Sequence, residues 1–223
     1  MSVLVVRLEG PLQAWSTQGR MGIRDTEREP TKSGVIGLIA AALGVQRDDD
    51  DRVSELSTVR MGVRVDRAGT LLHDYHTAGG GAFRGREYSV YGTKGTVVSH
   101  RYYLQDASFV AALEGDTTLL GRIADALYSP RYPLFLGRRS CPPSVVPLIG
   151  IVDGDMRSAL LAAPLCDRPD EPPYRIVVES TGDSGDARSD VPVSFSRVER
   201  RHARRYVITD WIKRPAVPEE TRS

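Results

Sequence analysis

The run from Pro30 to Gly44 constrains the fold most, because it is a helix-length stretch with almost no polar residue after its first turn. Pro30 is a helix-start signal, and Thr31 or Ser33 can cap the first backbone N–H groups. Gly44 is a natural C-cap. The residues from Val35 to Leu43 are apolar on nearly every side, which predicts a helix buried in a core.

The first turn of this helix admits two interpretations. Lys32-Ser33 resembles the end of a phosphate-binding loop, but that motif needs glycines before the lysine, and residues 26–31 contain none. This absence disfavours a nucleotide-hydrolysing loop. A helix N-terminus that carries a lysine can still attract an anion through its free N–H groups and dipole. The helix is therefore either an ordinary capped core helix or one whose first turn faces a phosphate backbone.

Hydrophobic periodicity predicts further strands and helices around this segment. Strands are expected at residues 3–8, 59–65, 70–77, 97–103, 107–113 and 147–152, and helices at 51–56 and 117–128. Residues 59–65 alternate as a half-buried strand, and we expect residues 70–77 to be its hairpin partner across the turn at 67–69. The order predicts an α+β chain with a ferredoxin-like βαββαβ core over residues 1–152.

An insertion interrupts this core at about residues 78–98. It holds Gly79-Gly80-Gly81 and places Phe83 and Tyr88 among basic residues. Aromatic side chains interleaved with arginine and glycine suit phosphate contacts and base stacking by RNA-binding proteins. A surface hairpin with no such role is the alternative.

Residues 153–223 are expected to form a small C-terminal, β-rich subdomain. Strand candidates are Tyr174–Glu179 and Tyr206–Trp211, with an acidic Gly/Ser-rich loop at Ser180–Asp190 between them.

Composition limits the class of protein more than its partner. The formal net charge is +1, which neither requires nor excludes nucleic acid, although basic residues cluster at 84–101, 131–139 and 197–205. Cys141 and Cys166 have neither zinc-ligand spacing nor a disulfide framework, which favours a reducing cytoplasm. No apolar run reaches membrane-spanning length. His73 and Asp74 would point to opposite faces of a strand without a third ligand nearby, so we expect no metal and no cofactor.

Several motifs in order resemble one known family. They are "VRLEGPLQAW" (6–15), "PTKSGVIGLIAAALGVQRDD" (30–49), "DYHT" (74–77), "RYYLQDASF" (101–109) and "PRYPLFLGRRSCP" (130–142). This series is similar to the CasD (Cas5e-type) subunits of type I-E CRISPR surveillance complexes, called Cascade. The likeness runs from Val3 to about Pro142.

The resemblance implies an RRM-related core with a protruding β-hairpin thumb, formed by the insertion. It implies a subunit that caps the 5′ handle of the CRISPR RNA, contacts the backbone and large subunits, and supports binding of target DNA by the assembled complex. No catalytic residue is expected. The candidate RNA-binding residues are Gln13, Trp15, Arg24, Lys32, Ser33, His76, Arg84, Arg86, Tyr88, Lys94, His100, Arg101, Arg138 and Arg139.

Two alternatives stay open. A related type I-C branch cuts repeat RNA with a tyrosine and an adjacent Lys-His pair, but this sequence has no Lys-His dipeptide, and His100 follows Ser99. A metal-independent endoribonuclease is therefore the second hypothesis. A general single-stranded RNA-binding module is the third.

Overall fold

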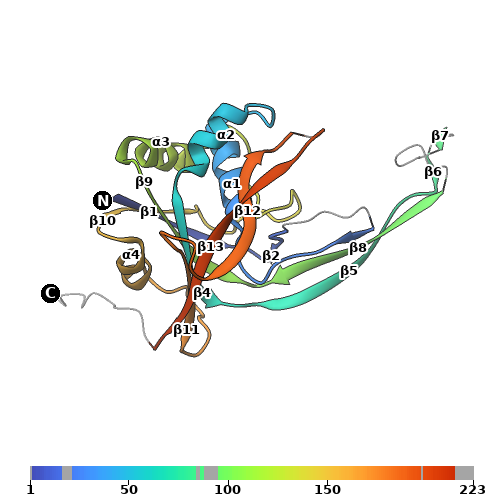
Figure 1. Ribbon diagram of the computed structural model, residues 1–223. Coiled ribbons are helices and arrows are strands. Elements are labelled where there is room, and N and C mark those ends of the chain that lie inside the picture. The colour runs from blue at the N-terminus through green and yellow to red at the C-terminus, as the bar shows by residue number, and fades with distance from the viewer. Residues whose placement is uncertain (1, 17–21, 84–85, 88–94, 197, 214–223) are drawn as a thin grey trace.

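The computed structural model describes residues 2–16, 22–83, 86–87, 95–196 and 198–213 (Figure 1). Over these ranges the chain is α+β, with one large antiparallel sheet, four helices and a long hairpin that projects from one side. None of the helices in this part of the chain is long and apolar enough to cross a membrane.

The large sheet has seven strands. Their spatial order is β10 (Leu148–Asp153), β1 (Ser2–Glu9), β9 (Ser108–Gly115), β4 (Arg60–Arg67), β11 (Tyr174–Glu179), β13 (Arg201–Ile212) and β12 (Asp186–Ser194). Every neighbouring pair is antiparallel. Strand β4 is buried on both faces, although its alternation predicted a half-buried strand.

Helices cover both faces of this sheet. The larger core lies between the sheet and α1 (Lys32–Leu43), α2 (Asp50–Ser57) and α3 (Thr117–Tyr128), whereas α4 (Met156–Ala162) covers the opposite face. Alternate residues of β1 serve the two layers, since Leu4 and Val6 join the larger core and Val3 joins the cluster under α4. The sequence predicted α3 at its observed bounds and missed α4.

Helix α1 is the buried core helix that its sequence predicts. Thr31 caps its start, with Oγ1 accepting a hydrogen bond from the Gly34 N–H at 3.2 Å. Gly44 ends it in the left-handed region at φ 74°. Gly34 lies against the ring of Trp15, where a Cβ atom would come within 2.7 Å of a ring carbon. The helix therefore packs closely onto Trp15.

The projecting hairpin, called the arm here, consists of β5 (Thr70–Gly79) and β8 (Thr96–Gln105), paired from Thr70–Gln105 to Gly79–Thr96. The short strands β2 (Leu12–Gln13) and β3 (Ile23–Arg24) lie along β8. Near the far end, β6 (Ala82–Phe83) pairs with β7 (Arg86–Glu87) (Figure 1).

The expected pairing of residues 70–77 with residues 59–65 is wrong, because both edges of β4 are occupied by β9 and β11. The hairpin therefore begins at residue 70, before the expected insertion at 78–98.

The C-terminal strands continue the large sheet, through the pairing of β11 with β4. Part of the loop expected at 180–190 is strand, since β12 begins at Asp186. Acidic residues in this segment suggested an exposed loop, but Asp190 is buried and paired with Arg205. The division into units at 1–152 and 153–223 remains a prediction.

A buried ionic cluster joins the start of α1 to these C-terminal strands. The Lys32 Nζ atom lies 3.0 Å from Glu179 Oε1, and the Lys32 backbone N–H donates to Asp190 Oδ2 at 2.8 Å. Arg205 donates to both Asp190 oxygens, at 2.6 and 2.9 Å, and its Nη1 lies 3.3 Å from Glu179 Oε2. Two cations and two carboxylates thus neutralise one another at the helix start.

Burial and these contacts shift the pKa values of Lys32 and Asp190. Burial lowers the pKa of Lys32, and the charge of Glu179 offsets only part of that effect. Burial alone would raise the pKa of Asp190, but the hydrogen bonds and charge of Arg205, with the Lys32 N–H, hold it below its usual value. Asp190 is therefore an ionised acceptor that the fold stabilises.

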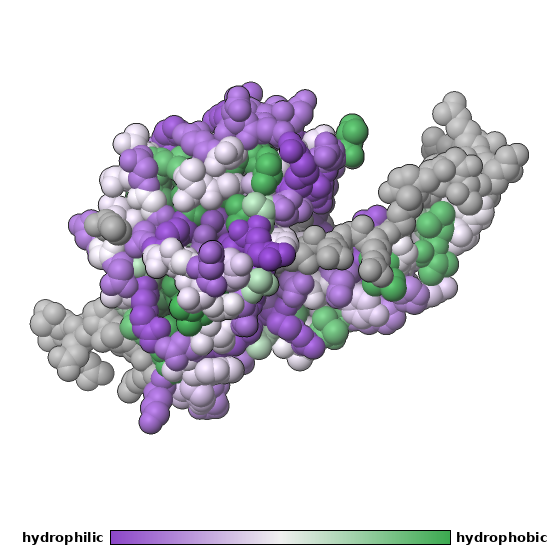
Figure 2. Space-filling model, in the orientation of Figure 1, coloured by the Kyte–Doolittle hydropathy of each residue, from purple (hydrophilic) through white to green (hydrophobic). Residues whose placement is uncertain are grey.

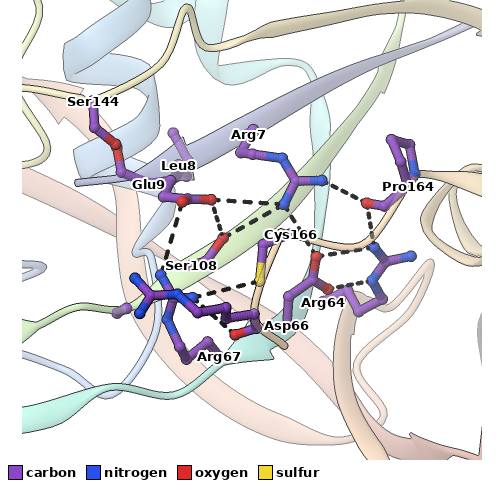
Figure 3. Close-up of polar contacts among 12 residues, drawn as sticks. Arg7, Leu8, Glu9, Arg64, Asp66, Arg67, Ser108, Ser144, Pro164 and Cys166 are labelled. Carbon is purple, nitrogen blue, oxygen red and sulfur yellow. Dashed lines mark hydrogen bonds and ion pairs between the residues drawn. The ribbon is translucent and has the colours of Figure 1, made fainter. Parts of the chain in front are cut away.

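A second buried cluster ties α4 to the sheet (Figure 3). The fully buried Arg64 makes a two-point contact with Asp66, at 2.6 and 3.1 Å, and donates to the carbonyls of Leu160, Ala163 and Pro164 at the end of α4. Arg7 of β1 reaches the same Asp66 at 3.2 Å. A cation at a helix C-terminus satisfies carbonyls that lack helical partners, which explains a buried arginine in this strand.

The Asp190 contacts predict an acid-sensitive contribution to stability. Asp190→Asn should lower the free energy of unfolding by about 3 kcal/mol at neutral pH, because it removes the charge that pairs with buried Arg205. Since the folded pKa of Asp190 lies below the unfolded value of about 3.9, this contribution is complete above that value and disappears as the pH falls through the folded pKa. Urea unfolding of both proteins from pH 7 to pH 2 should show a constant gap above about pH 4 and a narrowing gap below it, and a gap that stays constant over the whole range would contradict the role assigned to Asp190.

Candidate functional site

The arm presents two faces of different chemistry. Successive side chains on a strand point to opposite sides, and residues paired across strands share a side. One face, the arginine face, carries Arg24, Asp74, His76, Ser99 and Arg101. The other, the ring face, carries Ile23, Leu71, His73, Tyr75, Thr77, Val98, His100 and Tyr102.

The arginine face brings together three predicted site residues. Arg101 pairs with Asp74 of β5 on one side and with Arg24 of β3 on the other. The Arg101 Nε–H donates to Ser99 Oγ at 3.2 Å, and His76 Nδ1 lies 3.5 Å from Asp74 Oδ2. Arg24, His76 and Arg101 are each partly exposed. Two guanidinium groups in adjacent strands form a cationic surface that suits phosphate oxygens.

The ring face carries a row of aromatic side chains in contact with one another. The His73 ring lies parallel to the Tyr102 ring at a centroid distance of 4.7 Å and to the His100 ring at 5.1 Å. His73 Nε2 and His100 Nδ1 are 2.9 Å apart and share a hydrogen bond. Tyr75 meets His100 edge to face at 5.5 Å. These contacts hold the rings in defined orientations.

His100 was predicted as a site residue, but His73, Tyr75 and Tyr102 were missed. A signal exists in the sequence: His73-Asp74-Tyr75 and His100-Arg101-Tyr102 both place His and Tyr two residues apart. In an antiparallel pair this spacing sets each His opposite a Tyr, as observed. This signal is useful only when β5 is known to pair with β8, whereas the sequence predicted that β5 pairs with β4.

Arg138 supports the base of the arm. It donates to the backbone carbonyls of Tyr102, Arg24 and Asp25 at 2.7–3.0 Å, and its guanidinium lies 4.8 Å from the Tyr103 ring centroid. Its contacts thus position β3 against β8, and because the side chain is partly exposed, a direct RNA contact stays a prediction. Arg139 is exposed.

Gln13 and Trp15 are also internal rather than surface residues, since both are fully buried. Gln13 Nε2 donates to the carbonyls of Leu8 and Ala107, and Trp15 Nε1 donates to Gln13 Oε1 at 2.9 Å. Their side chains are satisfied inside the core, so the prediction that they contact RNA is corrected.

The start of α1 is likewise closed to an external phosphate. Lys32 is 2% exposed and Ser33 8%, and the anion at this helix start is Asp190 of the same chain. The sequence could not show this, because the carboxylates that occupy the site lie about 150 residues further along the chain. The core-helix interpretation is the one that the structure supports.

One further predicted residue, Arg86, lies near the end of the arm (Figure 1). Arg86 belongs to β7, whereas Arg84, Tyr88 and Lys94 fall outside the described residues. Across the described part of the chain, no group of three or more His, Cys, Asp or Glu side chains is arranged to hold a metal ion.

Comparison with known proteins identifies the family. The sequence pattern of the family described as CRISPR-associated protein (Cas_Cas5) matches residues 3–208. The chain belongs to the Cas5 family of CRISPR-associated proteins.

Known proteins resemble the chain in sequence and in structure. It is 40% identical over 153 residues to the CRISPR system Cascade subunit CasD of Escherichia coli (strain K12). The aligned region covers 63% of this chain and 67% of the relative. A solved chain described as a Cas protein superposes with a TM-score of 0.76 at 39% identity, covering 98% of both chains. A chain from a CRISPR RNA-guided surveillance complex superposes with a TM-score of 0.80 at 34% identity, covering 99% of this chain and 95% of the other.

The burial of Lys32 predicts a structural role that a variant can test. Lys32→Ala should lower the free energy of unfolding by about 2 kcal/mol, because it leaves a cavity and removes an ion from the Glu179 cluster. The slope of log Kd for RNA against log salt concentration should not change, since no phosphate contact is lost. A flatter slope with unchanged stability would restore the phosphate-facing interpretation. Arg157→Ala, which breaks an exposed pair with Asp210, is the control.

Proposed function

We propose that this chain is a non-catalytic subunit of a CRISPR RNA-guided surveillance complex and binds the 5′ handle of the CRISPR RNA. Membership of the Cas5 family and similarity to the Cascade subunit CasD support the assembly. The observation that carries the RNA role is the arginine face, where the partly exposed Arg24 and Arg101 lie side by side on the projecting arm. Backbone phosphates supply most of the affinity of such contacts, and arginine matches their geometry.

The same proposal gives the chain its partners. It would contact the backbone and large subunits of the complex, and the assembled complex would bind target DNA. Similarity to a chain of a surveillance complex over 99% of this sequence supports this placement. We expect the assembly to act in the cytoplasm.

We also propose that the sheet contains a ferredoxin-like, RRM-related unit. The strands β1, β4, β9 and β10, with α1 and α3 between them in the chain, support this assignment. Their spatial order β10-β1-β9-β4, antiparallel throughout, is that of a split βαβ pair. In this arrangement the arm is an insertion between the second and third strands.

Endoribonuclease activity is the alternative, and the histidine pair is its natural candidate for acid–base catalysis. A general acid and a general base must each reach the scissile phosphodiester. His73 Nε2 and His100 Nδ1 instead bond to each other at 2.9 Å, which leaves no room for a phosphate between them. The geometry therefore favours binding without cleavage.

Incubation of the purified protein with CRISPR repeat RNA in EDTA tests the alternative directly. We expect intact RNA by denaturing gel electrophoresis, because His73 and His100 bond to each other and do not flank a phosphate. Cleavage that persists in EDTA and disappears in His100→Ala would overturn the non-catalytic assignment.

Arg101 should make the strongest single contribution of the arginine face. Arg101→Ala should weaken handle binding by about 1–3 kcal/mol, the range for the loss of one bidentate or stacking contact. Fluorescence anisotropy with labelled handle RNA measures the change.

The matched control is Arg122→Ala, because Arg122 lies on α3 in an exposed pair with Glu55. Arg67 is unsuitable as an inert control, since it bonds to Asp106 and to the Arg168 carbonyl. Equal affinities for the Arg101 and Arg122 variants would remove Arg101 from the site.

A further inference from the structure

The ring face is an exposed apolar surface that no described part of the chain covers. Tyr75 is 62% exposed, Ile23 52%, Leu71 45% and Val98 38%. Ile23 extends this surface to a third strand, because it pairs with His100. Figure 2 shows hydrophobic side chains along the arm, away from the body of the protein. A contiguous patch of this kind on a projecting element is typical of an interaction site.

The charge of the ring face indicates which kind of partner it can bind. Among the ring-face residues that the structure describes there is no carboxylate, because Asp74 points to the other side and pairs in register with Arg101. Two imidazoles and two phenols supply aromatic rings and hydrogen-bonding groups without negative charge. A polyanion with flat aromatic groups fits such a face, and an acidic surface would have repelled it.

Contacts within the arm orient the row of rings. His73 stacks on Tyr102, and its hydrogen bond to His100 sets the two imidazoles edge to edge in nearly the same plane. A base that stacks on a prearranged ring loses less conformational entropy than one that must order a mobile side chain. The pairing of His73 with Tyr102 and of Tyr75 with His100 thus gives the ring face an ordered aromatic surface.

We propose that unpaired bases of the CRISPR RNA stack on the ring face, with Tyr75 as the principal contact. This inference rests on the proposed RNA-binding function and assigns it a second surface. Strand β5 is the outer strand of the arm over the described residues, with β8 on its one paired side. RNA that crosses this outer edge can place phosphates toward Arg101 and bases against Tyr75. The arm would then read single-stranded RNA on one face and its backbone on the other.

Replacement of Tyr75 in the full-length protein tests this assignment. Tyr75→Ala should raise the Kd for single-stranded handle RNA about 5- to 100-fold, as expected for the loss of one base stack, whereas Tyr75→Phe should bind like the unchanged protein. The matched control is Tyr128→Ala, because Tyr128 is 78% exposed on α3. Circular dichroism of each variant checks folding.

An RNA of the same length with abasic sites in the handle separates bases from phosphates. It should bind the unchanged protein as weakly as intact RNA binds Tyr75→Ala, and Tyr75→Ala should weaken its binding no further. Equal Kd values for Tyr75→Ala and Tyr128→Ala with intact RNA would overturn the inference while leaving handle binding in place. Failure of the unchanged protein to prefer handle RNA over unrelated RNA would instead reject the proposed function.

A protein occupant of the same face gives a different result. In that case Tyr75→Ala would leave the Kd for RNA unchanged and would reduce recovery of the chain with the other subunits of the complex. This outcome would also contradict base stacking. Single-stranded DNA of the handle sequence serves as a third probe, and DNA binding equal to RNA binding would contradict the assignment to CRISPR RNA.

Discussion

The buried cluster of Lys32, Glu179, Asp190 and Arg205 determines which surfaces of this protein are available. It closes the start of α1 with carboxylates from β11 and β12 and thereby attaches the C-terminal strands to the helical layer. A helix N-terminus attracts anions, and here the chain supplies its own. Nucleic-acid binding is then left to surfaces outside the core, and the arm is the most prominent of these (Figure 1).

The arm differs from the rest of the molecule in how its side chains are used. In the central strands of the large sheet, helices cover both faces, and even arginines such as Arg64 are buried and paired. In the arm, the two faces are chemically distinct, with partly exposed guanidinium groups on one side and more exposed aromatic rings on the other. This separation follows directly from the two-residue period of a β-strand. A single hairpin can therefore offer RNA both a phosphate contact and a stacking surface.

Local patterns predicted much of the fold but only part of the site. Helix α1, helix α3 and strand β11 carry their signals within a few turns or residues, and they lie where the sequence placed them. The partner of β5 could not be read locally, because it depends on β11 occupying the free edge of β4 more than 100 residues later. The same distance hid the burial of Lys32. The motifs of the family pointed to Gln13 and Trp15, but the side chains of these residues are buried in the core.

We expect the arm, and not the start of α1, to hold the RNA. Ultraviolet cross-linking of the protein to handle RNA, followed by mass spectrometry, distinguishes the two surfaces. Cross-linked peptides should contain Tyr75 or residues 98–102, and none should contain residues 29–35. Cross-links at residues 29–35 with an unmodified arm would contradict this expectation.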